Sequence, residues 1–484
     1  MVKFRITPLV CAALGTAAGF YFLSSFVFSA AVAVAIASVF ALCLFRVLAS
    51  FGRERKWQIM SFCMTALSAG LILGICASHA GRNQVSFGIQ EGKVTAIEGV
   101  LLEDPRIISG GRALASLSLR RSGAGSLRAG SSGEITVFFS QECAQRLKES
   151  GRGTAIFAEG KLRSSDSGYT FGAESLHIVK RASPVERMRT SVRLSLIKRF
   201  DGKSWGGLAL ALLVGIKDNL DTNLAAMYRD TGFSYILALS GMHLAVLAGF
   251  IAFLLKRPLG LKLSAVTGAA IICLYCFLVG PMPSLNRAAL MYLLTVAAIL
   301  GALPKEPMSI LALSFLIQIT ATPQAGSSIS FILSYLALAG ILVIGQPFYS
   351  LASGKVPDFV MHPLSASAGA FLATAGVTCF VFGRIAPVGI ITGLALVPLT
   401  TLFMTGSMIW LFLDFFSLSG FLNFPLSLLY GLMEKVVSLS GKIPALASVN
   451  PFLIFSFSVV LSLLIVFFEY KRRASLLRLQ PFIT

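Results

Sequence analysis

The chain has 484 residues, of which 56% are hydrophobic and only 13% are charged, and its formal net charge is +20 at pH 7. Soluble domains carry about twice that charged fraction, so this composition excludes a soluble globular protein. The surplus of Lys and Arg favours an anionic partner, nucleic acid or lipid, without identifying which.

Apolar runs long enough to cross a membrane recur from one end of the chain to the other. We count about twelve of them, some before and most after a polar region. They comprise residues 7–23, 26–49, 57–77, 233–255, 263–279, 285–302, 308–322, 329–344, 364–381, 390–413, 422–439 and 451–468. The predicted fold class is therefore a polytopic α-helical membrane protein.

Clusters of Lys and Arg flank several of these runs and predict the orientation of the chain. They lie at residues 3–5, 53–56, 256–262 and 471–473, and such clusters face the cytoplasm. Both termini are then cytoplasmic. The polar region that follows the third span, residues 81–182, is extracytoplasmic.

Between residues 84 and 180 the hydrophobic period changes from that of helices to that of strands. Short alternating runs such as GEITVFFS and GTAIFAEGKL are separated by Gly, Ser and charged residues, which is typical of β-strands. We expect a small antiparallel β-barrel inserted after the third span. An OB-like fold is the leading candidate, and such barrels bind oligonucleotides or oligosaccharides on one face.

Basic loops in this domain could follow a phosphate backbone. The candidates for nucleic-acid binding are Arg120, Arg121, Arg128, Arg146, Lys148 and Arg152. Aromatic residues that could stack on bases are few. A solvated basic surface near anionic lipid explains the charge equally well.

Residues 183–232 join the polar domain to the later spans. VERMRTSVRLSLIKRF (185–200) has apolar residues at helical spacing among many basic ones, which predicts an amphipathic helix on the membrane surface. WGGLALALLVGI (205–216) is apolar but too short to cross alone. Counting it as a span would also reverse the orientation of the basic tail, so we expect a re-entrant or interfacial segment.

Polar residues interrupt the apolar runs that follow. Ser240, Gly241 and His243 stand within SYILALSGMHLAVLAGF. Arg287 follows a Pro/Gly break, with Ser284 one turn before it. A charge at membrane depth is costly unless it is paired or hydrated, so an intramembrane arginine is a site candidate by default. Broken backbone at that depth is tolerated where it is buried in protein or lines a water-filled cavity.

Two further polar positions complete the candidate set. Ser334 lies in ISFILSYLALAGIL, and Arg384 lies at a predicted span end, where snorkelling to the interface is a sufficient explanation. His243, taken alone, is more often a hydrogen-bonded histidine between helices. For Arg287 we favour a functional role over a purely structural one.

Known catalytic and metal-binding patterns give little support to an enzyme. Ser240 and His243 could meet on one helical face as a nucleophile and its base, but no third, orienting acid accompanies them. Cys273 and Cys276 have metal-like spacing without a second pair or a histidine, and buried cysteines are the better explanation. The sequence has no P-loop, HExxH or dinucleotide motif. We therefore expect no enzyme activity, no cofactor and no metal.

Taken together, these residues resemble the ComEC family of competence DNA-uptake channels, over roughly residues 85–400. ALLVGIKDNLDTNLAAMYRDTGFSYILALSGMHLAVLAG (211–249) follows the family's LLLG turn, short polar helix and Ser-Gly-x-His segment. VGPMPSLNRAALM, ISFILSYLALAGIL and FGRIAPVGIITGLALVPL match later family segments in the same order. The insert corresponds to the family's external OB-like domain.

The resemblance implies a function, a cellular location and a set of path-lining residues. The chain would be a channel subunit of the bacterial cytoplasmic (inner) membrane that takes up single-stranded DNA during natural transformation. Its domains would be N-terminal membrane helices (1–80), the OB-like domain (81–182), an interfacial and re-entrant segment (183–232), the channel domain (233–470) and a basic cytoplasmic tail (471–484). By the same resemblance, the residues lining or shaping the path are Ser240, Gly241, His243, Ser284, Arg287, Ser334 and Arg384.

The chain departs from the family pattern at several positions. Tyr235 stands in place of the family's first histidine, and Ile216 in place of its aspartate. Ile332 replaces a glutamine and Gly393 an asparagine. Many members continue into a metallo-β-lactamase-like nuclease domain that has no counterpart in this sequence, so we expect a channel without a nuclease domain of its own.

The expected partners follow from this interpretation. Beside single-stranded DNA and membrane lipid, they are a separate nuclease, a periplasmic DNA-binding protein and a cytoplasmic helicase or ATPase, and the chain could form a homodimer. The alternative function is a membrane transporter or handler of another anionic polymer, such as a glycan or a lipid-linked precursor. An intramembrane Ser/His hydrolase ranks below both.

Overall fold

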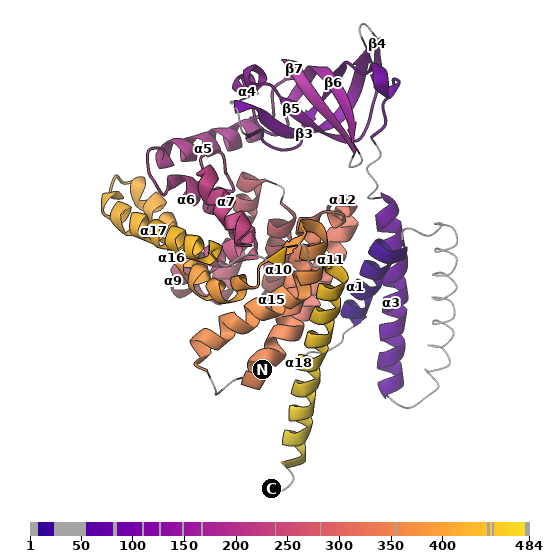
Figure 1. The fold of residues 1–484 in the computed structure, drawn as a ribbon, viewed down its shortest axis with the longest axis vertical. Helices are drawn as coiled ribbons and strands as arrows, with labels where there is room; N and C mark the ends of the chain where they lie inside the picture. Colours follow the sequence, from indigo (N-terminus) through magenta and orange to yellow (C-terminus); the bar gives the residue numbers. More distant parts are fainter. Residues whose placement is uncertain are drawn as a thin grey trace. The chain divides into compact units, whose positions relative to one another are not determined.

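The computed structural model describes residues 8–479 apart from 24–54, 81–84, 109–110, 125–126, 148–149, 166–167, 238, 281, 353, 355, 443–445 and 448–449. The chain divides into two compact units (Figure 1), which we describe separately. The barrel unit comprises Arg82–Leu220 and Phe277–Pro281. The membrane unit comprises Met1–Gly81, Asp221–Cys276 and Met282–Thr484.

The barrel unit is built on strands whose apolar side chains alternate along the sequence. The long strands are β1 (Ala96–Leu101), β3 (Ala113–Ala124), β5 (Glu134–Phe139), β6 (Ala155–Ser165) and β7 (Gly168–Lys180). β1 pairs with both β3 and β6, β3 pairs with β5, β5 lies parallel to β7, and β7 pairs with β6. The strands thus close into a ring, which confirms the predicted OB-like barrel, although the β5–β7 pairing is parallel where an antiparallel barrel was predicted.

Shorter elements complete this barrel. β2 (Arg106–Ile107) and β4 (Leu127–Gly130) pair with β3, and α4 (Gln141–Leu147) connects β5 to β6. The interior is filled by apolar side chains from alternate strand positions, and the fully buried ones include Ile97, Leu117, Val137, Ile156 and Phe171. The barrel therefore has a hydrophobic core of its own.

Helix α5 (Pro184–Phe200) follows the barrel in the same unit. The hydroxyl of Ser183 accepts a hydrogen bond from the N–H of Glu186, and Pro184 takes the first helical position, which is a strong helix start. One charge is turned inward on this helix, because Arg189 is 2% exposed, whereas Arg187 and Lys198 are exposed. The apolar side chains exposed on the helix are Val185, Met188 and Val192. The exposed surface of α5 therefore carries both apolar and basic side chains, unlike the polar outer face of a soluble amphipathic helix.

Helix α6 (Gly206–Val214) is the short apolar segment predicted as re-entrant or interfacial. Nearly all of its residues are buried, as expected for a helix that is apolar on every side. It ends at Gly215, whose φ of 77° is the left-handed conformation typical of a helix C-cap. Its placement relative to the membrane stays a prediction.

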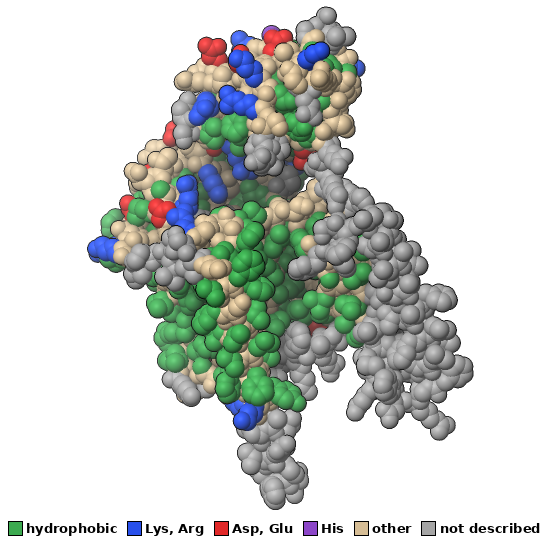
Figure 2. Space-filling model, turned by 45° about the vertical axis from the view of Figure 1, so that its right-hand side comes forward, with side chains coloured by type: hydrophobic (Ala, Val, Ile, Leu, Met, Phe, Trp, Pro, Cys, Tyr) green, Lys and Arg blue, Asp and Glu red, His purple; other side chains and the backbone are tan. Residues whose placement is uncertain are grey.

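The membrane unit is helical (Figure 1). Its elements are α1 (Pro8–Ala18), η1 (Gly19–Leu23), α3 (Arg55–Ala80), α7 (Thr222–Asp230), α8 (Ser234–Leu237), α9 (Gly241–Val279, with its last residues in the barrel unit), α10 (Pro283–Leu300), α11 (Pro307–Ala321), α12 (Pro323–Gly326), α13 (Ile329–Gly340), η4 (Ile341–Gly345), α14 (Gln346–Ala352), α15 (Asp358–Phe382), β8 (Arg384–Ile385), α16 (Val388–Asp414), η5 (Gly420–Leu422), α17 (Asn423–Gly441), β9 (Leu446–Ala447) and α18 (Pro451–Leu479). Figure 2 shows hydrophobic side chains covering much of the helical surface on the face drawn.

Among the residues that the structure describes, six helices are long and apolar enough to cross a membrane. They are α9, α10, α13 continued by η4 and α14, α15, α16 and α18. Their presence confirms the polytopic α-helical class. The count of about twelve spans stays a prediction, and the predicted span 26–49 falls outside the described residues.

Helix α9 corresponds to two predicted spans. It has 39 residues, about twice the length that one crossing requires. At Gly260 the φ of 71° and ψ of 177° are not helical, so the helix bends there. Lys256, Arg257 and Lys262 flank the bend and are exposed, as expected at the end of a membrane-embedded segment.

The N-terminal helices α1 and α3 cross at glycines. A Cβ atom on Gly15 would collide with the carbonyl oxygen of Leu67, and one on Gly70 would collide with that of Ala12. The same close approach recurs four residues further on, at Gly19 in η1 and at Gly74 in α3. Small residues four apart let membrane helices pack backbone against backbone, so these glycines determine how the two helices associate.

Candidate functional site

Helix α9 begins inside an apolar run because Ser240 caps it. α8 ends at Leu237 and α9 starts at Gly241. The N–H of Ser240 donates to Nδ1 of His243 at 3.1 Å, and the Ser240 hydroxyl lies 3.0 Å from the same nitrogen. A side chain at the third helical position that accepts from the N-cap N–H makes one half of a capping box, a role that Glu or Gln usually fills. The polar residues of SYILALSGMHLAVLAGF therefore start a helix in mid-run.

The cap also determines the state of His243. A backbone N–H can only donate, so Nδ1 accepts and carries no proton. The side chain is 1% exposed, and protein encloses the imidazole. His243 thus acts as a neutral hydrogen-bond acceptor that determines where α9 begins.

A second break in the apolar sequence precedes α10. Gly280 has a φ of +100°, a conformation that glycine adopts at little cost, and Pro283 takes the first position of α10. Ser284 follows, and its hydroxyl lies 2.9 Å from that of Ser334 in α13. Two serines that are 50 positions apart in the sequence are therefore in direct contact.

Arg287 lies one turn into α10 and is 7% exposed. Its guanidinium carbon is 5.8 Å from the centre of the Tyr335 ring. A Cβ atom on Gly241 would lie 3.1 Å from Nη2 of Arg287, so the guanidinium is beside the start of α9. In the described segments, its Nε has no hydrogen-bond partner and no carboxylate pairs with it.

A hydrogen-bond network that we did not predict holds Tyr335. Its hydroxyl lies 3.0 Å from Oε1 of Gln318 and 3.3 Å from Oγ of Ser314, both in α11. Gln318 also donates to the carbonyl of Pro283 at 3.3 Å. The network holds the start of α10 and the ring beside Arg287. Polar residues four apart within the apolar run 308–322 were the available signal.

We call this assembly the polar cluster. It combines α9, α10, α11 and α13, and its members are Ser240, Gly241, His243, Ser284, Arg287, Ser314, Gln318, Ser334 and Tyr335. Six of the seven predicted path positions belong to it. Arg384 makes its contact elsewhere: it lies 3.2 Å from Asp230, and both side chains are well exposed.

The basic residues predicted to bind nucleic acid make local contacts within the barrel unit. Arg120 is exposed on β3, and Arg121 lies 3.9 Å from Glu98. Arg128 covers the ring of Phe157 at 4.9 Å. Cation and aromatic ring are thus paired with each other.

The remaining basic positions contact other parts of the same unit. Arg146 in α4 donates to the carbonyl of Leu176 at 3.3 Å, and Arg152 lies 3.0 Å from Glu186. Lys148 falls outside the described residues. Nucleic-acid binding by this set stays a prediction.

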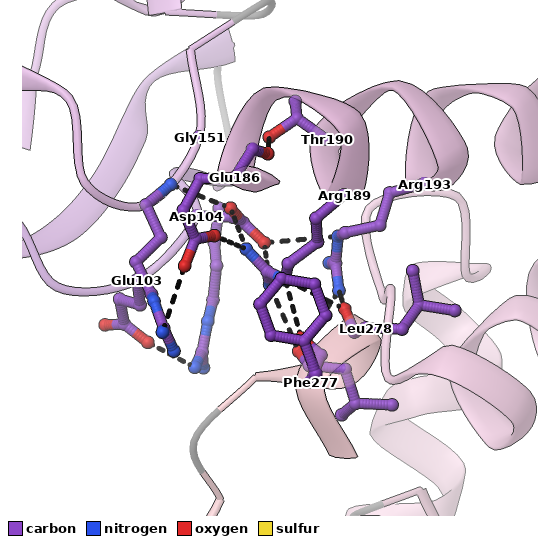
Figure 3. Close-up of polar contacts among 12 residues, drawn as sticks. Glu103, Asp104, Gly151, Glu186, Arg189, Thr190, Arg193, Phe277 and Leu278 are labelled. Atoms are coloured by element: carbon purple, nitrogen blue, oxygen red, sulfur yellow. Dashed lines mark hydrogen bonds and ion pairs between the residues drawn. The ribbon is translucent and has the colours of Figure 1, made fainter. Parts of the chain in front are cut away.

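A second buried polar group lies in the barrel unit (Figure 3). Arg189 of α5 donates to both carboxylate oxygens of Asp104, at 2.7 and 3.1 Å. Nε of Arg193 lies 3.1 Å from Oδ2 of the same aspartate. Asp104 is therefore shared by two arginines of one helix.

The same arginines cap the C-terminal end of α9. Nε of Arg189 donates to the carbonyls of Phe277 and Leu278 at 2.9 and 3.1 Å. Arg193 donates to that of Val279 at 3.2 Å. The last carbonyls of a helix have no partner inside it, and positive charge is favourable there. The end of α9 is thus satisfied within the barrel unit.

The environment of Asp104 determines its protonation. Burial alone would raise its pKa, but Arg193, Arg189 and the N–H of Arg152 outweigh burial. The pKa of Asp104 is consequently held below its ordinary value, and the carboxylate stays ionised. An ionised carboxylate that accepts several charge-assisted bonds is a strong local anchor.

Metal binding has no support in the described ranges, where no group of three or more His, Cys, Asp and Glu side chains could hold an ion. Cys273 is exposed and Cys276 is half-buried, both as free cysteines in α9.

A known protein family matches the part of the chain that contains the polar cluster. The family model described as "Competence protein" matches residues 212–473. This is more than half of the chain, and it includes every member of the polar cluster. It leaves the barrel strands outside the matched range.

One curated relative extends the comparison. "ComE operon protein 3" from Bacillus subtilis (strain 168) is 24% identical over 159 residues, which are 32% of this chain and 20% of that protein. The chain thus spans about a fifth of the length of that relative. No solved structure matches.

Proposed function

This chain belongs to the Competence protein family, and from that premise we propose that its membrane unit forms the path by which single-stranded DNA crosses the cytoplasmic membrane during natural transformation. The family's role in DNA uptake supplies the substrate. The path itself is inferred from the polar cluster.

The convergence of distant polar residues at two helix starts carries this proposal. Ser240 and Gly241 begin α9, Ser284 and Arg287 begin α10, and Ser334 comes from α13. Broken helices at membrane depth are tolerated where they line a cavity or lie inside protein. In transporters such half-helix starts point at anionic substrate groups.

The chemistry of the cluster suits a polyanion. Its members are hydroxyls, an amide, a neutral imidazole, a phenol and one guanidinium, without a carboxylate. An anion path needs neutral-polar or positive lining and little acid. A phosphodiester backbone presents one negative charge for each nucleotide and meets no acidic side chain in this set.

The proposal includes a topology. Both termini lie in the cytoplasm and the OB-like barrel lies outside, where it meets incoming DNA first. The exposed basic clusters at the bend of α9 support the orientation, since such clusters face the cytoplasm. The exposed apolar face of α5 supports a location at the outer membrane surface.

Two other functions have weaker support. A glycan-handling transporter would use the same fold, but the family match favours DNA. An intramembrane hydrolase would need Nδ1 of His243 to receive the proton of Ser240. That nitrogen already accepts from the Ser240 backbone N–H, so the pair is built as a helix cap.

The direct test is DNA uptake in living cells. A naturally competent host that lacks its own family member is complemented with this chain, and labelled DNA reaching the cytosol is measured. We expect uptake to be restored. Failure with a protein shown to be inserted in the membrane would argue against the channel role.

A further inference from the structure

Among the residues that the structure describes, Arg287 is a buried charge without a counter-ion. It is 7% exposed, and the described part of the chain offers it a cation–π contact with Tyr335 but no ion pair. Leaving a buried charge uncompensated is strongly unfavourable. The Tyr335 ring accounts for only part of the compensation, since a cation–π contact is weaker than a buried ion pair.

The neighbour of this guanidinium adds to the problem. Nη2 of Arg287 faces the position where Gly241 lacks a side chain, and Gly241 is the first residue of the long helix α9. The N-terminus of a helix carries roughly half a positive charge. Two positive features therefore face each other across a glycine.

Side chains of α10 lie directly against the start of α9. A Cβ built on Gly241 would lie 3.1 Å from Nη2 of Arg287 and 3.6 Å from Cβ of Ala288, so the guanidinium packs against this glycine. Ser284 lies three residues before Arg287 and shares a face of α10 with it, and its hydroxyl contacts that of Ser334, the residue before Tyr335. Hydroxyls can donate to an anion as well as accept.

We propose that this is an anion-binding site that takes one phosphodiester group of single-stranded DNA at the guanidinium of Arg287, beside the N-terminus of α9. The inference rests on the proposed function and gives it a contact point. Helix N-termini and arginine are the two groups that proteins use most for phosphate. Because the contact is to the backbone, binding does not depend on base sequence.

DNA rather than lipid is the ligand on structural grounds. His243, Arg287 and Tyr335 are all at least nine-tenths buried. A lipid would need a site open to the exposed apolar faces of the helices, because its acyl chains must lie against them. The site is instead enclosed by α9, α10 and α13.

The test uses the full-length chain in nanodiscs of zwitterionic lipid, with a fluorescent oligodeoxythymidylate as the probe. Arg287→Ala should weaken binding by about ten- to a hundredfold and reduce the slope of log affinity against log salt by about 0.7. Lys305→Ala removes one exposed positive charge from the same unit and should leave both values nearly unchanged. Equal behaviour of the two variants would overturn the proposal.

A neutral-backbone probe isolates the phosphate contact. A methylphosphonate oligothymidylate should bind wild type and Arg287→Ala equally. If Arg287→Ala weakens both probes alike, the arginine acts by holding the fold and the proposed contact is wrong.

Gly241→Ala serves if Arg287→Ala does not fold. Alanine is a good helix former and keeps the arginine, but its methyl group would lie 3.1 Å from Nη2 and displace the guanidinium, so binding should weaken while the helix is kept. Unchanged binding by this variant would contradict the site.

Nanodiscs containing phosphatidylglycerol separate the two sources of phosphodiester. Loss of lipid retention in Arg287→Ala, with DNA binding intact, would assign the site to lipid and overturn the inference. If the wild-type chain restores uptake in cells but Arg287→Ala leaves the oligonucleotide affinity unchanged, this inference fails and the proposed function stands. If wild type neither binds the oligonucleotide nor restores uptake, the proposed function fails as well.

Discussion

Arg189 and Asp104 form a two-pronged ion pair between residues 85 positions apart, with Nη2 2.7 Å from Oδ2 and Nη1 3.1 Å from Oδ1. The arginine comes from α5 and the aspartate from the loop after β1. The same guanidinium donates to the last carbonyls of α9. One buried side chain therefore ties three separate segments of the barrel unit together.

Asp104→Asn should destabilise the barrel unit by about 3 kcal/mol, because removing one partner of a buried ion pair leaves the other charge unsatisfied. The amide is close to the carboxylate in size, so packing is little changed. Native-state hydrogen exchange of the β-strand amides in the full-length protein measures the effect.

Arg106→Ala is the matched control for this prediction. Arg106 lies 2.7 Å from Glu103, but its side chain is 59% exposed, and an exposed pair contributes less than about 1 kcal/mol. Equal losses of protection in the two variants would contradict a special role for Asp104.

The stabilising effect of Asp104 should depend on pH in one direction. Its pKa is lower in the folded protein than in the unfolded chain, so its contribution is fully present above the ordinary aspartate pKa of about 4 and is lost as the pH falls below it. The stability difference between wild type and Asp104→Asn should therefore be constant near neutrality and shrink in acid. A difference that grows in acid would refute the assignment.

Gly70→Ala should destabilise the membrane unit by about 1–3 kcal/mol, because the added methyl group meets the carbonyl of Ala12 and forces α1 and α3 apart. Gly249→Ala is the control, since a Cβ there meets nothing within 4 Å. Its effect should be neutral or stabilising. Thermal unfolding in detergent compares the two, and indistinguishable midpoints would show that the glycine crossing does not matter.

A comparison of His243→Leu with His243→Gln should distinguish the helix-capping role of His243 from its other contacts in the polar cluster. Leucine removes the acceptor for the Ser240 N–H and should lower the stability by about 1 kcal/mol. Glutamine is an ordinary capping-box partner and should keep most of that stability. Hydrogen exchange at the first amides of α9 reports the difference. DNA uptake by His243→Leu should fall although the protein is inserted. If leucine and glutamine behave alike, the cap assignment is incorrect.

Much of this architecture was accessible from sequence, because its signals are local. Alternating apolar residues predicted the OB-like barrel, and long apolar runs predicted the membrane helices. Ser240, His243 and Arg287 were conspicuous because polar residues are costly in apolar runs. Those positions do meet in the structure, with Arg287 beside Gly241.

The remaining features depend on contacts between segments that are distant in the sequence, and hydrophobic periodicity does not predict such contacts. The run 233–255 reads as continuous, yet a cap divides it at Ser240. Arg384 was grouped with the path, but the fold pairs it with Asp230. Gln318 and the Asp104 network carry no local signal strong enough to name their partners.

The central claim is that DNA passes the polar cluster, and crosslinking during uptake tests it most directly. A photoreactive amino acid is placed at Ser334, and separately at Phe253, which is 79% exposed on α9. Cells are illuminated while labelled DNA is entering. We predict a covalent DNA adduct at position 334 and none at 253. Continued uptake with no adduct at 334 would contradict the path.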